Sequence, residues 1–442
     1  MAQIAGPKPE KKYLDDCVHC GFCLPACPTY VLWGEEMDSP RGRIYMMRKA
    51  VEGEAPLDAR FRTHMDNCLG CMACMTACPS GVEYNKLIEP TRAQIESDVP
   101  RSRGDRLFRR LIFATFPYPV RLRAMALPLL VYQKSGLQSL FRRSGLTRRL
   151  PKRLAAMEAL LPDVPLRAFI PQSAIVRPKK APRRRVGMLS GCVQRVFFPQ
   201  VNAATARVLA AEECEVIIPR NQPCCGALML HSGLEEEAAA RARKMIAAFD
   251  DANVDAIVIN SAGCGSTMKE YGHLLRDDPA WADRAAAFSA KCEDISEILN
   301  ELEPRARRHP LKLRVAYHDA CHLQHAQGIR EQPRCLLADI PELELADIPE
   351  ASLCCGSAGV FNLLQPDTAQ QLGARKVDNL LSTGAEAVAS ANPGCLLQLM
   401  NGLRARGLKT MPAFHMVELL DASIRGVPVS DLLHRQSHKG AL

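Results

Sequence analysis

The sequence lacks three features, each of which would place it in a different class of protein. It contains no run of 18 or more apolar residues, so it predicts no membrane-spanning helix. Its first residues lack the apolar core of a secretory signal peptide, which predicts a cytoplasmic location in a reducing compartment. No G-x-G-x-x-G fingerprint opens a strand-turn-helix unit, so hydride chemistry on a dinucleotide requires another chain.

Cysteine is abundant instead, with 19 among 442 residues. Two stretches, 17–28 and 68–79, share the spacing C-x2-C-x2-C-x3-C-P, which holds two cubane clusters with the fourth cysteine ligating the other cluster. Zinc would leave half of these eight cysteines unused, and disulfides suit small secreted chains. We therefore expect two [4Fe-4S] clusters, one held by Cys17, Cys20, Cys23 and Cys78 and the other by Cys27, Cys68, Cys71 and Cys74.

The length allows about three domains, and 47% hydrophobic residues suffice for ordinary globular cores. Residues 1–95 form the predicted two-cluster ferredoxin-type domain. Within it, residues 38–49 predict a helix with Asp or Ser at its N-cap and Pro in its first turn. Arg41 and Arg43 of this helix either raise the reduction potential of an adjacent anionic cluster or are solvated on the helix face.

Residues 96–182 form a predicted basic helical connector. Between Arg101 and Arg185 there are 21 Lys and Arg against three acidic residues, a local charge of +18 within a net charge of +9. Apolar clusters at 107–113 and 125–132 alternate with arginines at helical intervals. Such helices lie on a membrane interface or an acidic partner, or pack on their own chain as a linker. Prolines, including Pro128, should divide the connector into short pieces.

An α/β unit follows and occurs twice, at about 183–305 and 306–442. Short apolar runs at 185–189 and 256–260 predict buried parallel strands, and residues 202–212 and 235–249 predict helices. Corresponding cysteines lie 129 to 131 residues apart, which predicts two homologous domains in a pseudo-two-fold pair. The expected fold is therefore α+β and multidomain: a mainly helical ferredoxin domain followed by two α/β cysteine-rich domains.

Each unit offers four cysteines at predicted strand ends, where residues of an α/β sheet converge on a site. The cofactor-binding candidates are Cys192, Cys224, Cys225 and Cys264 in the first unit and Cys321, Cys354, Cys355 and Cys395 in the second.

Glycine after each Cys-Cys pair should let the backbone approach closely and leave room for a cofactor. His318 and His322 flank Cys321 and are either ligands, proton carriers or structural histidines. Cys214, Cys292 and Cys335 fall outside the pattern and should be ordinary buried residues.

Nearly the whole chain resembles the iron-sulfur subunit of glycolate oxidase (glycolate dehydrogenase), most closely at residues 17–23, 38–45, 202–209, 323–327 and 353–359. It is more distantly similar to heterodisulfide reductase subunits, the anaerobic glycerol-3-phosphate dehydrogenase small subunit and the lactate-utilisation iron-sulfur protein. Heterodisulfide reductases place a fifth cysteine where this chain has Thr267 and Gln398. A conventional iron-sulfur cluster, a zinc ion or an empty thiol pocket therefore stay open for these domains.

The resemblance implies an electron-transfer subunit that receives electrons from FAD-containing dehydrogenase subunits oxidising a 2-hydroxy acid and passes them to a quinone or other acceptor. Peripheral contact with the cytoplasmic face of the inner membrane would fit the basic connector. A reductase that splits disulfides at the cysteine-rich domains is the alternative activity, and the missing fifth cysteines disfavour it. Nucleic-acid binding by the connector is disfavoured, because apolar clusters lie between its arginines and it has no recognisable fold of that kind.

Overall fold

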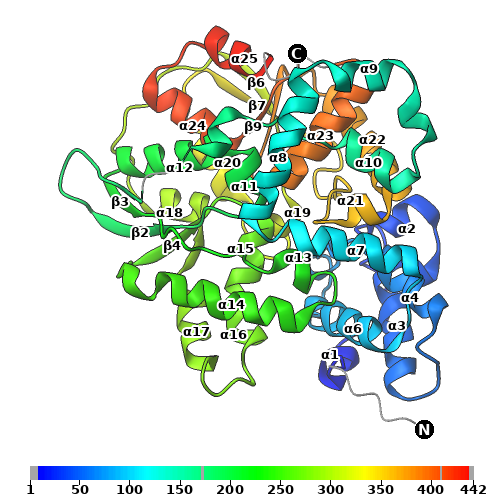
Figure 1. Ribbon diagram of the computed structural model, residues 1–442. Coiled ribbons are helices and arrows are strands. Elements are labelled where there is room, and N and C mark those ends of the chain that lie inside the picture. The colour runs from blue at the N-terminus through cyan, green and yellow to red at the C-terminus, as the bar shows by residue number, and fades with distance from the viewer. Residues whose placement is uncertain (1–7, 171–173, 409–410, 438–442) are drawn as a thin grey trace.

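The computed structural model describes residues 8–170, 174–408 and 411–437. The N-terminal part, blue in Figure 1, is helical and contains α1 (Lys11–Asp15), α2 (Pro28–Trp33), η1 (Glu36–Asp38), α3 (Pro40–Val51), α4 (Ala59–Asn67), α5 (Ala73–Thr76) and α6 (Asn85–Asp98). Helix α3 begins as its sequence predicts. Ser39 is the N-cap, its hydroxyl accepts a hydrogen bond from the Gly42 amide at 3.0 Å, and Pro40 occupies the first turn.

The connector is a set of helices along one side of the molecule, cyan to teal in Figure 1. They are α7 (Arg103–Thr115), α8 (Pro119–Lys134), α9 (Leu137–Arg143), η2 (Leu146–Arg149), α10 (Lys152–Ala159) and η3 (Leu166–Phe169). The prediction that Pro128 interrupts this stretch is wrong, because α8 continues through it. Pro128 and Ala124 are both exposed, so water can satisfy the Ala124 carbonyl that lacks a donor.

The first α/β domain has a five-stranded sheet in the order β1-β3-β2-β4-β5. Its elements are β1 (Ile175–Val176), β2 (Arg184–Met188), α11 (Val193–Phe197), α12 (Pro199–Ala211), β3 (Cys214–Ile217), α13 (Ala227–Leu230), α14 (Glu235–Phe249), η4 (Asp250–Ala252), β4 (Ala256–Ile259), α15 (Ala262–Lys269), α16 (Tyr271–Leu274), α17 (Ala282–Ala290), β5 (Cys292–Asp294) and α18 (Ile295–Glu301). Strand β1, from the end of the predicted connector, is antiparallel to β3, and the other pairs are parallel.

The second α/β domain has a four-stranded parallel sheet in the order β7-β6-β8-β9. Its elements are β6 (Leu313–His318), α19 (Cys321–Gln324), α20 (Glu331–Ala338), β7 (Leu343–Ala346), α21 (Phe361–Leu364), α22 (Pro366–Leu381), β8 (Ala387–Ser390), α23 (Pro393–Ala405), β9 (Ala413–His415), α24 (Met416–Arg425) and α25 (Val429–Ser437). Without β1, the strand order of the first sheet is the same, which fits the repeat seen in the sequence.

Strands β4 and β8 lie inside the two sheets, and every residue of both is buried. Helices cover both faces of each sheet, so these strands consist of continuous small and apolar residues, as is typical of parallel sheets. The carboxyl ends of the central strands lead directly into the cysteine-bearing loops. The fold thereby brings cysteines that are far apart in the sequence to one edge of each sheet.

Candidate metal centres and the cavity between them

Four cysteines gather at the surface of the helical domain. Cys17, Cys20, Cys23 and Cys78 line one small cavity, together with Cys74. Cys20 is exposed, and its neighbours Val18 and Phe22 expose 67% and 66% of their surface. Two large apolar side chains therefore lie exposed beside the exposed Cys20 thiol.

The remaining cysteines of the two runs lie deeper. Cys27, Cys68 and Cys71 are buried and Cys74 is half-buried. Burial raises the pKa of each of the Cys71 and Cys74 thiols well above the usual value for cysteine. Without a cation these thiols would stay protonated, whereas bound iron would stabilise the thiolates, so this donor set fits an iron-sulfur cluster.

Buried arginines lie beside this inner set. The Arg43 guanidinium is 3.0 Å from Asp38 and 3.9 Å from the Cys27 sulfur, and the residue is only 1% exposed. Burial opposes ionisation of Cys68, yet the guanidinium groups of Arg43 and Arg92 lower the pKa of Cys68 below its usual value. Of the two alternatives, the solvated one is wrong for Arg43, because this residue is buried beside the inner cysteines.

Arg41 has different surroundings. It pairs with Glu36 at 2.7 Å and donates to the His19 carbonyl of the outer cysteine loop at 3.3 Å. Its side chain is 31% exposed, so solvent screens its charge more than that of Arg43.

The inner cysteine loop packs against the second α/β domain. The Gly70 carbonyl accepts a hydrogen bond from His322 at 2.8 Å, and Thr76 is hydrogen-bonded to His325 at 2.7 Å. Cys71 belongs to the same buried apolar cluster as Cys354. The structure therefore joins the inner ferredoxin-type site to the cysteines of the second domain, and His322 has a structural role in this contact.

The predicted cysteines converge in both α/β domains. In the second, the sulfurs of Cys321 and Cys354 are 3.9 Å apart. In the first, contact with the Cys224 thiol, together with burial, raises the pKa of Cys192. In each domain the four thiols are neighbours in pairs along a chain, and together they form a donor set that suits a thiophilic metal or an iron-sulfur cluster.

The glycine after each Cys-Cys pair allows a close backbone approach, as predicted. Gly226 and Gly356 both have φ of +87°, a conformation that side-chain-bearing residues rarely adopt. A Cβ at Gly356 would lie 2.7 Å from the Ala369 carbonyl, so the glycine permits close packing against helix α22. The turn and the helix contact both require glycine at this position.

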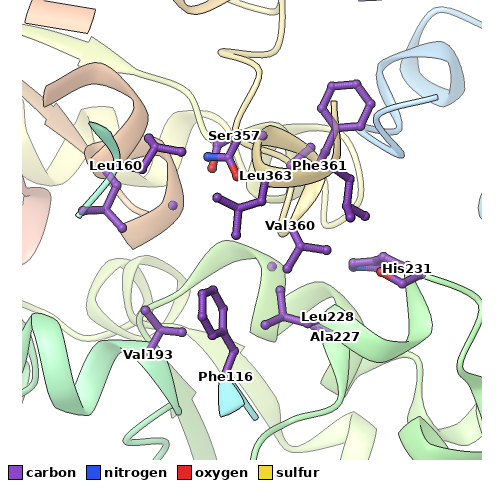
Figure 2. A pocket seen from close by; sticks show the side chains of 18 of the residues that line it. Phe116, Leu160, Val193, Ala227, Leu228, His231, Ser357, Val360, Phe361 and Leu363 are labelled. Atoms are coloured by element: carbon purple, nitrogen blue, oxygen red, sulfur yellow. The ribbon is translucent and has the colours of Figure 1, made fainter. Parts of the chain in front are cut away.

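A cavity of about 700 Å³ lies between the connector and the two α/β domains. Both sets of four cysteines line it, as does Cys68 of the inner ferredoxin-type site. The other walls are mostly apolar: Figure 2 shows Phe116 and Leu160 from the connector, Val193 and Leu228 from the first domain, and Val360 and Leu363 from the second. One cavity thus adjoins three of the four cysteine sites.

The sequence did not reveal this cavity, because its walls come from segments more than 200 residues apart. Arg92 was also missed, since nothing in helix α6 marks it as a neighbour of Cys68. Of the three cysteines outside the patterns, Cys214 and Cys292 are buried as predicted, but Cys335 is exposed on α20, so that prediction is wrong. Its neighbours Leu336 and Leu337 fill the buried face of this helix.

Three family models match the chain: a 4Fe-4S dicluster domain at residues 13–82, the linker region of the glycolate oxidase iron-sulfur subunit at 104–161, and a cysteine-rich domain at 186–269 and 315–400. The chain is 40% identical over 411 residues to the probable glycolate oxidase iron-sulfur subunit of Bacillus subtilis (strain 168), which covers 92% of this chain and 93% of that protein.

It is 35% identical over 439 residues to the glycolate oxidase iron-sulfur subunit of Escherichia coli (strain K12), covering 96% and 97% of the two chains. Lactate utilization protein A of Exiguobacterium sp. is 32% identical over 241 residues, covering 54% of this chain and 98% of that protein.

Proposed function

Because this chain belongs to the family of glycolate oxidase iron-sulfur subunits, we propose that it is the electron-transfer subunit of a glycolate dehydrogenase complex. Separate FAD-containing subunits oxidise the 2-hydroxy acid. The observation that supports this best is the placement of the cysteine sets: one lies at the surface, one lies inside, and the inner one adjoins the second cysteine-rich domain.

We assign the outer cubane to Cys17, Cys20, Cys23 and Cys78 and the inner cubane to Cys27, Cys68, Cys71 and Cys74. The clusters supply one-electron acceptors and donors, which a two-electron flavin donor needs when its acceptor is reduced in steps. The protein positions and tunes them. Cys20 reaches the surface, Arg43 places a positive charge beside the inner set, and His322 fixes the Gly70 loop against the second domain.

The exposed face around Val18, Cys20 and Phe22, here called the entry face, is the proposed docking site of the flavin subunit. Its two apolar side chains are exposed next to the cluster that must accept electrons from outside. Burial of such side chains provides the hydrophobic contact expected at the centre of an interface.

Replacing Phe22 by Glu should weaken this docking and lower glycolate-driven reduction of the clusters roughly tenfold or more. A carboxylate in an apolar interface loses hydration without gaining a partner. Co-purification of flavin subunits and stopped-flow bleaching of cluster absorbance would measure both effects. Leu166→Glu, at a position 70% exposed on the connector, is the matched control and should leave both unchanged.

The isolated chain should show no dye-linked glycolate oxidation, because its sequence has no dinucleotide fingerprint and oxidation is assigned to the flavin subunits. Turnover by a flavin-free preparation would contradict the proposed division of labour. If the Phe22→Glu variant still bound the flavin subunit fully, only the assignment of the entry face as the docking site would be contradicted.

The cavity between the cysteine-rich domains is the proposed site of a quinone-class acceptor. Its walls are mostly apolar, its volume of about 700 Å³ suits a ring-sized ligand, and cysteine sites border it.

Leu160→Trp would fill part of this space and should raise the KM for a short-chain quinone roughly tenfold, as overfilling a packed space usually costs about 1–3 kcal/mol. Steady-state kinetics of the assembled complex would measure this. Leu166→Trp is the control, and equal KM values in the two variants would place the acceptor elsewhere.

The connector is the proposed site of peripheral membrane contact. Arg103, Arg106, Leu107, Arg110 and Leu111 share one exposed stripe of α7, whereas Ile112 and Phe113 on the other side are buried. No described helix is long and apolar enough to span a bilayer.

Vesicle binding should be weak and reversible by salt. Basic residues contribute about 1 kcal/mol each near anionic headgroups, and this attraction decays over a Debye length of about 8 Å in physiological salt. Several connector arginines already pair with acidic groups, including Arg101, Arg109 and Arg153, so only part of the local charge is available. Sedimentation with anionic vesicles would measure binding, and retention in molar salt would contradict this mode.

We also infer that the two cysteine-rich domains form a pseudo-two-fold pair. Helix α12 of the first domain contacts α24 of the second, and the equivalent helices in the reverse sense, α18 and α20, also contact each other. Reciprocal contacts of this kind are what a two-fold relation between homologous domains requires.

A further inference from the structure

The two cysteine-rich domains differ at one buried position next to their thiols. His318 ends strand β6, three residues before Cys321. The corresponding residue of the first domain, three residues before Cys192, is Leu189. Both side chains are 1% exposed. The repeat therefore places an imidazole in one domain where the other has an aliphatic group.

The His318 ring has no ordinary partner. Neither of its nitrogens is hydrogen-bonded to a nitrogen or oxygen atom of the described residues. Three other histidines of the domain are satisfied: the half-buried His322 and the buried His325 bond to carbonyl and hydroxyl groups, and the buried His415 bonds to the Asn260 carbonyl and the Val417 amide. A buried polar group without a partner is costly, which indicates that His318 interacts with something else.

Two cysteine sulfurs lie beside this ring. One ring nitrogen and the sulfurs of Cys355 and Cys395 are all within 4.8 Å of one another. Ligands bound at about 2.0–2.3 Å around a tetrahedral metal are roughly 3.3–3.8 Å apart, so a small inward movement would complete such a site. Neutral imidazole and thiolate are the donors that zinc and iron accept together.

The residue at the missing fifth-cysteine position cannot take this place. Gln398 donates to the Ala369 carbonyl at 2.8 Å and accepts from Asn362 at 3.2 Å, so both ends of its amide are engaged within the protein. In the first domain, Thr267 is buried and Leu189 has no donor atom. The buried hydroxyl of Thr267 also has no hydrogen-bond partner among the described residues, but hydroxyls are not donors that zinc prefers, so of these positions only His318 adds an imidazole or thiol donor.

We propose that His318 is a metal ligand that shares one metal atom with Cys355 and Cys395. The second domain then has a mixed imidazole-thiolate site, whereas the first has only its four thiols. The inference does not depend on the proposed electron path; it requires only that the thiols of the second domain hold a metal.

The test uses the full chain, purified anaerobically, in a Cys225→Ala background that disables the first-domain site. Iron, zinc and acid-labile sulfide per chain are measured before and after dialysis against a chelator, with the two ferredoxin-type cubanes as internal standard. His318→Leu, which copies the first domain, should lose the second-domain metal at least about tenfold faster, since even residues that only orient a ligand change metal affinity about 10–100-fold. His318→Cys, which restores a donor, should retain it.

His415→Gln is the control, because it alters a buried histidine of the same domain that already has two partners. If His415→Gln lost metal as fast as His318→Leu, the proposal would be overturned, because the loss would then reflect packing and not ligation. Equal retention by His318→Leu and the parent would also overturn it, while leaving the cysteine-rich cofactor intact. If the parent variant Cys225→Ala contained only the irons of the two cubanes, neither His318 nor the thiols of the second domain would hold a metal. Electron transfer through the cubanes would not be contradicted by this result.

Discussion

Replacing Cys27 by Ser should abolish the inner cluster and lower quinone-linked turnover of the complex at least about 100-fold, while the outer cluster stays intact. Cys27 belongs to the first cysteine run, but it is only 6% exposed and adjoins the inner set. Burial, together with the nearby Cys27 sulfur, raises the pKa of Cys71 and Cys74. A serine hydroxyl replaces a thiolate poorly as an iron ligand. Paramagnetic resonance of the reduced protein would distinguish the clusters, because the spin coupling between them would disappear.

Cys20→Ser is the matched control, since Cys20 lies in the same run but reaches the surface. It should remove the outer cluster and abolish reduction by the flavin subunit, while the inner cluster still accepts electrons from a small chemical reductant. If Cys27→Ser removed only the outer cluster, the crossed ligation would be wrong.

Local patterns in the sequence predicted much of the fold. Helix α14 spans Glu235–Phe249, the range expected from its alanine-rich composition, and α3 starts at the predicted Ser-Pro cap. These elements are set by residues close together in the chain. The repeated Cys-Cys-Gly pattern likewise predicted two related domains, and the two sheets share one strand order.

The remaining features depend on contacts that no local pattern records. Arg41 and Arg43 are two residues apart in the sequence, yet one is a partly exposed ion pair and the other is buried beside the inner cysteines. His318 and His322 both flank Cys321 in the sequence, yet His318 faces two thiols and His322 bonds to the Gly70 loop. In each pair, the packing of a distant segment determines the chemistry of the side chain.

The contrast between the two arginines gives the second large effect. Arg43→Met should destabilise the ferredoxin-type domain by about 3–5 kcal/mol, because it removes the guanidinium paired with the buried Asp38 carboxylate and leaves that charge to the Asn67 amide and His64. It also leaves the His64 carbonyl without the donor that lies 2.7 Å away. Arg41→Met, which breaks a partly exposed pair with Glu36, should cost about 1 kcal/mol or less. The denaturant concentration at which cluster absorbance disappears would measure both.

Two variants separate the effect of Arg43 on stability from its effect on the reduction potential: the double variant Arg43→Met/Asp38→Asn tests stability, and Arg43→Met tests the potential. Removing both charges should recover part of the stability, because no buried carboxylate is left unpaired. Titration of the inner cluster in Arg43→Met should still show a lower reduction potential, on the order of 100 mV, since a positive charge near Cys27 no longer favours the added electron. The potential of the outer cluster should change much less. An unchanged inner potential would show that Arg43 only holds the fold together, with Asp38 cancelling its charge at the cluster.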